Sequence, residues 1–317
     1  MRTLRRLGLI FCFLLSSLNI ALAQYPNKPI AIVVPYEVGG GVDQVARLVA
    51  VKLTEKLKQT VLVENRSGAS NTIGMNYVAN AKADGYTLGF ITAAFLMTPF
   101  LMENHPYQPL SDFTPVAMIG TLPMMLAVNG SLPVSNLPEF IAYAKAHPGQ
   151  LNWASIGSAS SQGLAGLEFN QVTKIEATQI QYKGSASGLK DVIAGTVQYL
   201  FNPLPSLMQH AENGSIKILG SGGNRPLKDY PQISLIRQTV PGFSAQSWYG
   251  VVAPAKTPSG ITQALNQAIN EIVSESSMQD HLSSLGMQPM KLSPSEFAKW
   301  MRQESAKDEQ IFKALKP

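Results

Sequence analysis

The chain has 317 residues, a formal net charge of +5 and a single cysteine. Its lysines and arginines are dispersed, without the basic stripe that grips a phosphate backbone, so nucleic acid is not an expected partner. The length exceeds that of one ordinary hydrophobic core, which predicts two lobes.

The N-terminus has the features of a secretory signal peptide. Three arginines lie within the first six residues, an apolar segment follows at residues 7–15, and small residues at 21–23 form a cleavage site. Cleavage after Ala23 would remove those arginines and no acid, which takes the charge from +5 to +2, and would remove Cys12 as well. We therefore expect a periplasmic protein without disulfides or a thiol nucleophile.

Short apolar segments alternate with helical ones through the first third of the chain. We expect strands at residues 30–34, 61–63 and 86–92, each followed by a helix, at residues 42–58, 72–83 and 95–102. This βαβ rhythm is typical of a parallel sheet flanked by helices. In such sheets, ligands bind at the carboxyl ends of the strands.

A second α/β series follows. We expect strands at residues 124–128, 152–155, 178–182, 197–201 and 216–221, with helices at 137–146, 161–173 and 186–194. A strand at 248–254 precedes helices at 258–274, 278–285 and 294–315, which should return to the first lobe. Lobe 1 would comprise residues 24–120 and 247–317, lobe 2 residues 121–246, and the crossing segments 116–120 and 247–252 would form the hinge beside a cleft.

The turn after the first strand is the most informative segment. Glycines there let backbone amide groups and the start of the next helix point at a bound anion. The turn matches neither the dinucleotide fingerprint nor a P-loop, and the alternative is a plain tight turn. Asp43 is expected as a helix cap or first-turn acid. The candidate binding residues here are Tyr36, Glu37, Gly39, Gly40, Gly41 and Val42.

Two later loops could also receive an anion. Ser155, Ser158, Ser160 and Ser161 lie between a strand and a helix, and four hydroxyl groups are more than one helix cap needs. The alternative is capping alone. Residues 182–185 bring together the phenol of Tyr182, the ammonium of Lys183 and the amide of Gly184, with a generic loop as the alternative.

Signatures of enzymes and metal sites are missing from the sequence. It contains no G-x-S-x-G, and the S-x-x-K at residues 187–190 lacks the partners of a lactamase site. The four histidines are far apart and show no metal-binding spacing. We expect no catalysis, no cofactor and no metal. Trp153, Trp248 and Trp300 are expected to pack in the core or the hinge, although Trp248 falls where a cleft wall should be.

Several segments together resemble the substrate-binding receptors of tripartite tricarboxylate transporters, the Bug family. They occur in family order over nearly the whole mature chain: Pro35-Tyr36 with Gly39-Gly40, Asp43 and Ala46-Arg47, then 63–66, 84–88, 182–184, 248–250 and 253–254. The resemblance implies a two-lobed, type II periplasmic-binding-protein-like fold. It also implies a non-catalytic protein that closes on one di- or tricarboxylate, or on an aromatic or amidated acid.

The resemblance also implies a set of binding residues. Loops 36–42 and 67–71, the latter with Ser70 and Asn71, would hold one carboxylate, and the serine loop with Tyr182 and Gly184 would cover the other end. Ala93 would make one wall apolar. Val42 replaces a frequent threonine, Gly163 a frequent histidine and Asn202 a frequent aspartate.

Glu37 adds an acid to the anion-binding turn itself. If it faces the ligand, it predicts a preference for acids that carry an amine or amide donor, because like charges repel. The alternative is that it faces solvent or pairs with Lys183.

Three functions remain open from the sequence. A monomeric receptor that delivers its ligand to the membrane subunits of a tripartite transporter is favoured. The others are a sensor module for a signalling partner and an exported hydrolase with Ser158, Ser160 or Ser161 as nucleophile.

Overall fold

A long antiparallel strand pair, β4 (Phe113–Asn129) and β9 (Gln246–Pro254), runs through the middle of the protein. The computed structural model describes residues 25–102, 104–157, 160–182 and 184–315. The predicted signal peptide, Ser158 and Lys183 lie outside the described residues. The described strands form a 10-stranded sheet in the order β2-β1-β3-β9-β4-β7-β5-β6, and β8 and β10 pair with β4 beside this path.

One group of elements lies at the β2 edge of the sheet. Strands β1 (Ile30–Val34), β2 (Val61–Asn65) and β3 (Thr87–Thr92) pair in parallel, and β3 pairs antiparallel with β9. The connecting helices are α2 (Gly41–Leu57), the 3-10 turn η1 (Ala69–Asn71), α3 (Thr72–Ala79) and α4 (Ala94–Leu101). The buried apolar residues of α2 recur at spacings of one and three along one face, which holds this helix against the sheet.

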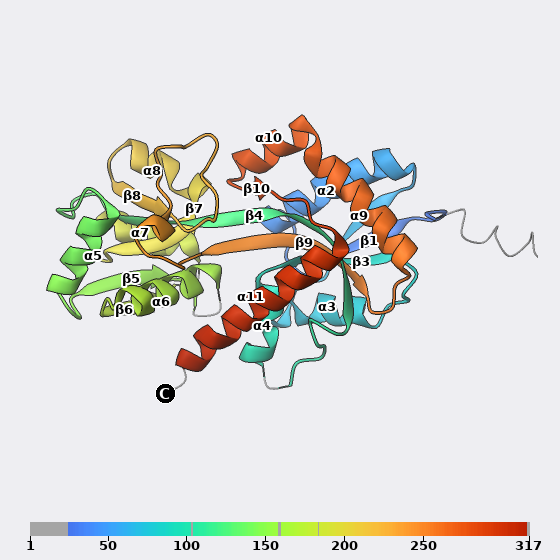
Figure 1. Ribbon diagram of the computed structural model, residues 1–317, viewed down its shortest axis with the longest axis horizontal. Coiled ribbons are helices and arrows are strands. Elements are labelled where there is room, and N and C mark those ends of the chain that lie inside the picture. Colours follow the sequence, from blue (N-terminus) through green and yellow to red (C-terminus); the bar gives the residue numbers. More distant parts are fainter. Residues whose placement is uncertain (1–24, 103, 158–159, 183, 316–317) are drawn as a thin grey trace, which may run out of the picture.

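A second group lies at the β6 edge. Strands β5 (Leu151–Ser155), β6 (Ala177–Gln181) and β7 (Tyr199–Pro203) are parallel, while β7 and β8 (Ile216–Ser221) pair antiparallel with β4. The helical segments are α5 (Leu137–Ala146), α6 (Ser161–Thr173), α7 (Ser185–Ala194), η2 (Leu204–Ser206), α8 (Met208–Glu212) and η3 (Ile236–Gln238). Figure 1 shows the two groups at opposite ends of the molecule, with β4 and β9 running between them.

The C-terminal elements pack back over the first group, as expected. They are α9 (Ser259–Ser274), α10 (Ser276–Ser284), β10 (Gln288–Pro289) and α11 (Pro294–Leu315). Helix α9 packs on α2, and α11 packs on α4. Helix α11 also reaches the second group, where Lys307 Nζ lies 2.9 Å from Glu168 Oε2 of α6.

The strand β4 differs from the prediction. Residues 116–120 and 124–128, expected as a hinge segment and a separate strand, belong to one continuous strand of 17 residues. Pro115 and Pro123 lie within it, and the register with β9 shifts between Pro115 and Ala117. A proline supplies no ladder N–H, and a local shift of register accommodates that loss without ending the strand.

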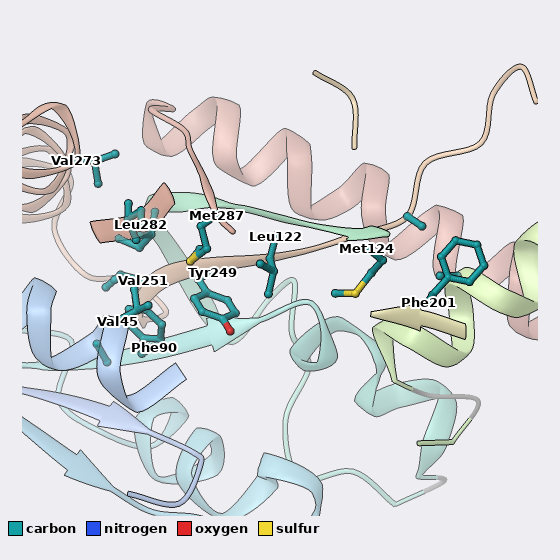
Figure 2. Close-up of a cluster of buried hydrophobic side chains, with 14 of the residues drawn as sticks. Val45, Phe90, Leu122, Met124, Phe201, Tyr249, Val251, Val273, Leu282 and Met287 are labelled. Carbon is teal, nitrogen blue, oxygen red and sulfur yellow. The ribbon is translucent and has the colours of Figure 1, made fainter. Parts of the chain in front are cut away.

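The buried side chains form a cluster that crosses β4. Figure 2 shows it passing from Val45 and Phe90 through Leu122 and Met124 to Phe201. Because the apolar contacts continue along the strand pair, the two strand groups are joined by packing as well as by chain connections. None of the described helices is long and apolar enough to cross a membrane.

A buried acid lies where α11 meets α6. Asp308 is 8% exposed, and burial together with the neighbouring carboxylates of Glu304 and Glu168 raises its pKa to about 7, against the opposing effect of Lys307. Lys307 Nζ also donates to the Ser244 carbonyl oxygen. The folded state therefore binds a proton on Asp308 that the unfolded chain releases near pH 4.

This site makes stability fall as the pH rises from about 4 to about 7, because the folded protein holds more protons than the unfolded one over that range. We expect Asp308→Asn to raise the free energy of unfolding at pH 8 by about 1–3 kcal/mol and to have little effect at pH 4. Urea denaturation at both pH values measures this, with the exposed Asp229→Asn as a control. An unchanged or less stable Asp308→Asn protein at pH 8 would contradict the assignment.

Candidate functional site

The carboxyl ends of the two parallel strand sets face each other across the middle of β4. Strands β3 and β4 are both antiparallel to β9, so they run in the same direction, and β3 ends toward the second group. Strand β7 is antiparallel to β4, and β5 and β6 run with β7, so these three end toward the first group. Loops at both sets of carboxyl ends thus meet at one place, where such sheets bind ligands.

The strand registers give the distance along β4 between the two sets of strand ends. Thr92, the end of β3, pairs with Tyr249, which pairs with Gly120 of β4. Pro203, the end of β7, pairs with Met124. Gly120 and Met124 are four positions apart, which corresponds to about 13 Å along a strand at about 3.3 Å per residue. The gap between the two sets of strand ends therefore suits a small molecule.

A buried carboxylate shapes the glycine-rich turn. The Asp43 carboxylate accepts hydrogen bonds from the Gly39 amide at 2.9 Å, Arg47 Nε at 2.8 Å and Asn65 Nδ2 at 2.8 Å. Burial raises the Asp43 pKa, but the hydrogen bonds from Arg47, Gly39 and Asn65 outweigh it and bring the pKa to about 2. Asp43 is thus the first-turn acid that the sequence predicted, and its hydrogen bond from the Gly39 amide holds the glycine-rich turn in place.

This support leaves the start of α2 open. The helix has no side-chain cap, and among the described residues the amides of Gly40, Gly41 and Val42 donate no hydrogen bond. Gly39 has a φ of +88°, which favours glycine, whereas a Cβ at Gly40 would meet only the Glu37 carbonyl oxygen, at 3.8 Å. Free amides at the start of a 17-residue helix favour an anion.

A hydroxyl cluster lies beside this turn. The Tyr36 hydroxyl is 2.7 Å from Thr92 Oγ1 and accepts a hydrogen bond of 3.1 Å from Asn71 Nδ2. Burial raises the pKa of Tyr36 to about 12, so the phenol stays protonated at neutral pH. The structure therefore brings Tyr36 and Asn71, predicted from separate loops, into direct contact.

Tyr249 belongs to the same cluster and was not predicted. Its side chain is 8% exposed, burial raises its pKa to about 12, and its hydroxyl makes no hydrogen bond with the described residues. Its proximity also contributes to the raised pKa of Tyr36.

Trp248 packs in the core, as expected, and does not form a cleft wall. Trp248 is fully buried and packs edge-on against Phe297 of α11, with ring centroids 5.6 Å apart. Successive residues of a strand point to opposite faces, so Tyr249 takes the other face of β9. Trp153 is buried in the core as expected.

The second group contributes a small pocket of its own, with a cavity volume of about 10 Å³, which is room for about one water molecule. Tyr182, Gly184 and Asn202, which were predicted to bind the ligand, line it, and so does Ser155 of the serine loop. Gln162 lines it without having been predicted as a binding residue. None of the described lining residues is a lysine, arginine or histidine. The Tyr182 hydroxyl donates to Asp191 Oδ2 at 2.6 Å, so its proton is already engaged.

The serine loop is used in part for capping. Ser160 Oγ accepts a hydrogen bond from the Gly163 amide at 2.9 Å and donates to the Gly157 carbonyl at 2.7 Å, which makes Ser160 the N-cap of α6. The capping alternative therefore describes this residue. Ser161 begins α6 and is half-buried, and Ser158 lies outside the described residues.

The remaining predicted residues lie around the first set of strand ends. Glu37 is exposed, and its suggested partner Lys183 is outside the described residues. Val42 is half-buried against the core, and Ala93, 9% exposed, is part of a buried apolar cluster at the start of α4. Ser70 lies in η1, next to Asn71.

Two parallel strand sets with facing carboxyl ends define an α/β ligand-binding fold. The chain belongs to the tripartite tricarboxylate transporter family of receptors, whose family model matches residues 45–316. This confirms the resemblance found in the sequence and the predicted periplasmic-binding-protein type of fold.

Relatives and solved structures agree with this assignment. BugT of Bordetella pertussis is 32% identical over 275 residues, which are 86% of this chain and 84% of BugT. The structure of R. palustris Rpa4515 with adipate has 33% sequence identity to this chain and a TM-score of 0.76. The match covers 91% of this chain and 97% of Rpa4515. MatC from Rhodopseudomonas palustris, with bound malate, is 28% identical with a TM-score of 0.71, at 91% and 100% coverage.

The open amides of the glycine-rich turn give a direct test. We expect Gly40→Val to weaken carboxylate binding at least tenfold, because the branched side chain covers the amides. The free energy of unfolding should change by less than about 0.5 kcal/mol, since space around the Cβ is open. Calorimetry and urea denaturation measure the two effects. Gly260→Val at the exposed start of α9 is the matched control, and a Gly40→Val protein that binds as tightly as the unchanged protein would exclude this turn as the site.

Proposed function

We propose that this protein captures a small carboxylate in the periplasm and delivers it to the membrane subunits of a tripartite tricarboxylate-type transporter. The observation that carries the proposal is the uncapped start of α2, whose amides of Gly40, Gly41 and Val42 donate no hydrogen bond to the described residues. A carboxylate there would receive charge-assisted hydrogen bonds from several amides. Bound adipate and malate in the similar proteins support this ligand class.

One carboxylate of the ligand would bind at the start of α2, at one end of the gap between the two sets of strand ends. The amides of Gly40 and Gly41 supply donors, and the hydroxyl of Tyr249 supplies a further one. Asp43 is neutralised in place by Arg47 and does not repel the ligand as an unpaired charge would. Glu37, being exposed, can turn away from the ligand.

A closing movement would complete the site. We assign residues 24–120 and 247–317 to lobe 1 and residues 121–246 to lobe 2, with β4 and β9 as the connections. Bending of these strands would bring the pocket of the second group over the ligand and exclude water, which strengthens each amide–anion contact. The protein would act as a monomer, because one chain supplies both halves.

We propose that the protein binds its ligand without catalysing a reaction. A hydrolase would need a general base beside a serine, and the Ser160 hydroxyl is committed to the cap of α6. The membership of a receptor family supports the same conclusion.

A screen of small organic acids tests the function. We expect at least one C4–C6 carboxylate to raise the melting temperature, since a ligand at 100 times its Kd adds about 2.7 kcal/mol of stability. The neutral methyl esters of the same acids serve as controls and should not bind. Equal stabilisation by acids and esters, or by none of a broad carboxylate panel, would contradict the proposal.

A further inference from the structure

The pocket of the second group contains a pair of amide side chains with unused hydrogen-bonding capacity. Gln162 Nε2, in the first turn of α6, donates to Asn202 Oδ1, near the end of β7, at 2.5 Å. Gln162 is 9% exposed and Asn202 is 3% exposed. The two residues are 40 positions apart in the sequence and meet only in this pocket.

Two atoms of this pair have no hydrogen-bond partner among the described residues. Gln162 Oε1 is buried and accepts no hydrogen bond from any of the described residues, although buried polar atoms in proteins are nearly always paired. Asn202 Nδ2 likewise donates none of the hydrogen bonds found in the described part of the chain. After the one bond between them, the pair offers one acceptor and one donor.

The chemistry of the pair is the same in either orientation of the two amides. If both side chains turn by 180°, Asn202 donates to Gln162, and the free atoms become the Gln162 nitrogen and the Asn202 oxygen. One donor and one acceptor remain. A ligand group that satisfies both must itself accept and donate.

We propose that Gln162 and Asn202 determine specificity by selecting a ligand whose far end is a neutral carboxamide. This inference rests on the proposed function, in which a carboxylate binds at the start of α2. A carboxamide accepts through its oxygen and donates through its nitrogen, and so it matches the pair. An ionised carboxylate only accepts, and would leave the free acceptor of the pair buried and unpaired.

A second carboxylate could bind here only as the protonated acid. Ordinary carboxyl pKa values lie about 3 units below neutral pH, so the protonated form costs about a thousandfold in affinity at pH 7. The pair therefore favours a monoamide over the dicarboxylate of equal length.

Matched ligands test the inference. Calorimetry at pH 7 compares succinate, glutarate and adipate with their monoamides, on the unchanged protein. We expect the best monoamide to bind at least tenfold more tightly than its parent dicarboxylate. Any dicarboxylate binding should strengthen toward tenfold per unit as the pH falls from 7 to 5, while monoamide binding should change little.

Substitutions assign the preference to the pair. Gln162→Leu should weaken monoamide binding at least tenfold and remove the pH dependence of dicarboxylate binding between pH 7 and pH 5, because an ionised carboxylate then leaves no acceptor of the pair unpaired. Asn202→Asp, which keeps an acceptor for Gln162 Nε2 but removes the free donor, should also weaken the monoamide. Gln171→Leu, an exposed position on the same helix, is the matched control and should change neither.

The outcomes separate the inference from the proposed function. Dicarboxylates that bind as tightly as their monoamides, or equal losses for both ligands in Gln162→Leu, overturn the amide preference and leave carboxylate capture intact. Failure of every acid and every monoamide to bind overturns both.

Discussion

The pairing of β4 is the constraint on which the rest of the structure depends. Within a single strand of 17 residues, β4 pairs with β9 along its first part and with β7 and β8 along its last part. Because β7 is antiparallel to β4 while β3 runs with it, the carboxyl ends of both strand sets face one another. Backbone register alone thus places the two candidate half-sites opposite each other.

The two half-sites differ in their chemistry. The first presents backbone amides, held by the buried carboxylate of Asp43, and hydroxyl groups that burial keeps protonated. The second presents a neutral amide pair in a pocket without a cation among its described lining residues. Such asymmetry would orient a ligand that is charged at one end and neutral at the other, because each end is satisfied in only one half-site.

Much of this architecture could be predicted from local sequence. The alternation of apolar strands with helices, the glycine-rich turn and the first-turn position of Asp43 are encoded over a few residues each, and the predicted segments lie close to the observed elements. Tyr182 and Gly184 could be assigned to a binding loop because they follow a predicted strand. Asn71 and Asn202 were assigned to the site only through the family resemblance.

The features that could not be predicted depend on contacts between residues that lie far apart in the sequence. Nothing local shows that β4 continues through Pro115 and Pro123, since its partners lie more than a hundred residues away in β9. Which of Trp248 and Tyr249 faces the site depends on where α11 packs. The role of Gln162 emerges only when Asn202 lies beside it, and Ser160 is recognised as a cap only from its bonds to Gly157 and Gly163.

A crystal structure of the mature protein with its tightest-binding acid would locate the ligand. We expect a carboxylate within hydrogen-bonding distance of the amides of residues 40–42, with the rest of the ligand directed toward Asn202. A ligand bound instead in the separate groove between α10 and residues 225–230, with the start of α2 bound only by water, would contradict this expectation.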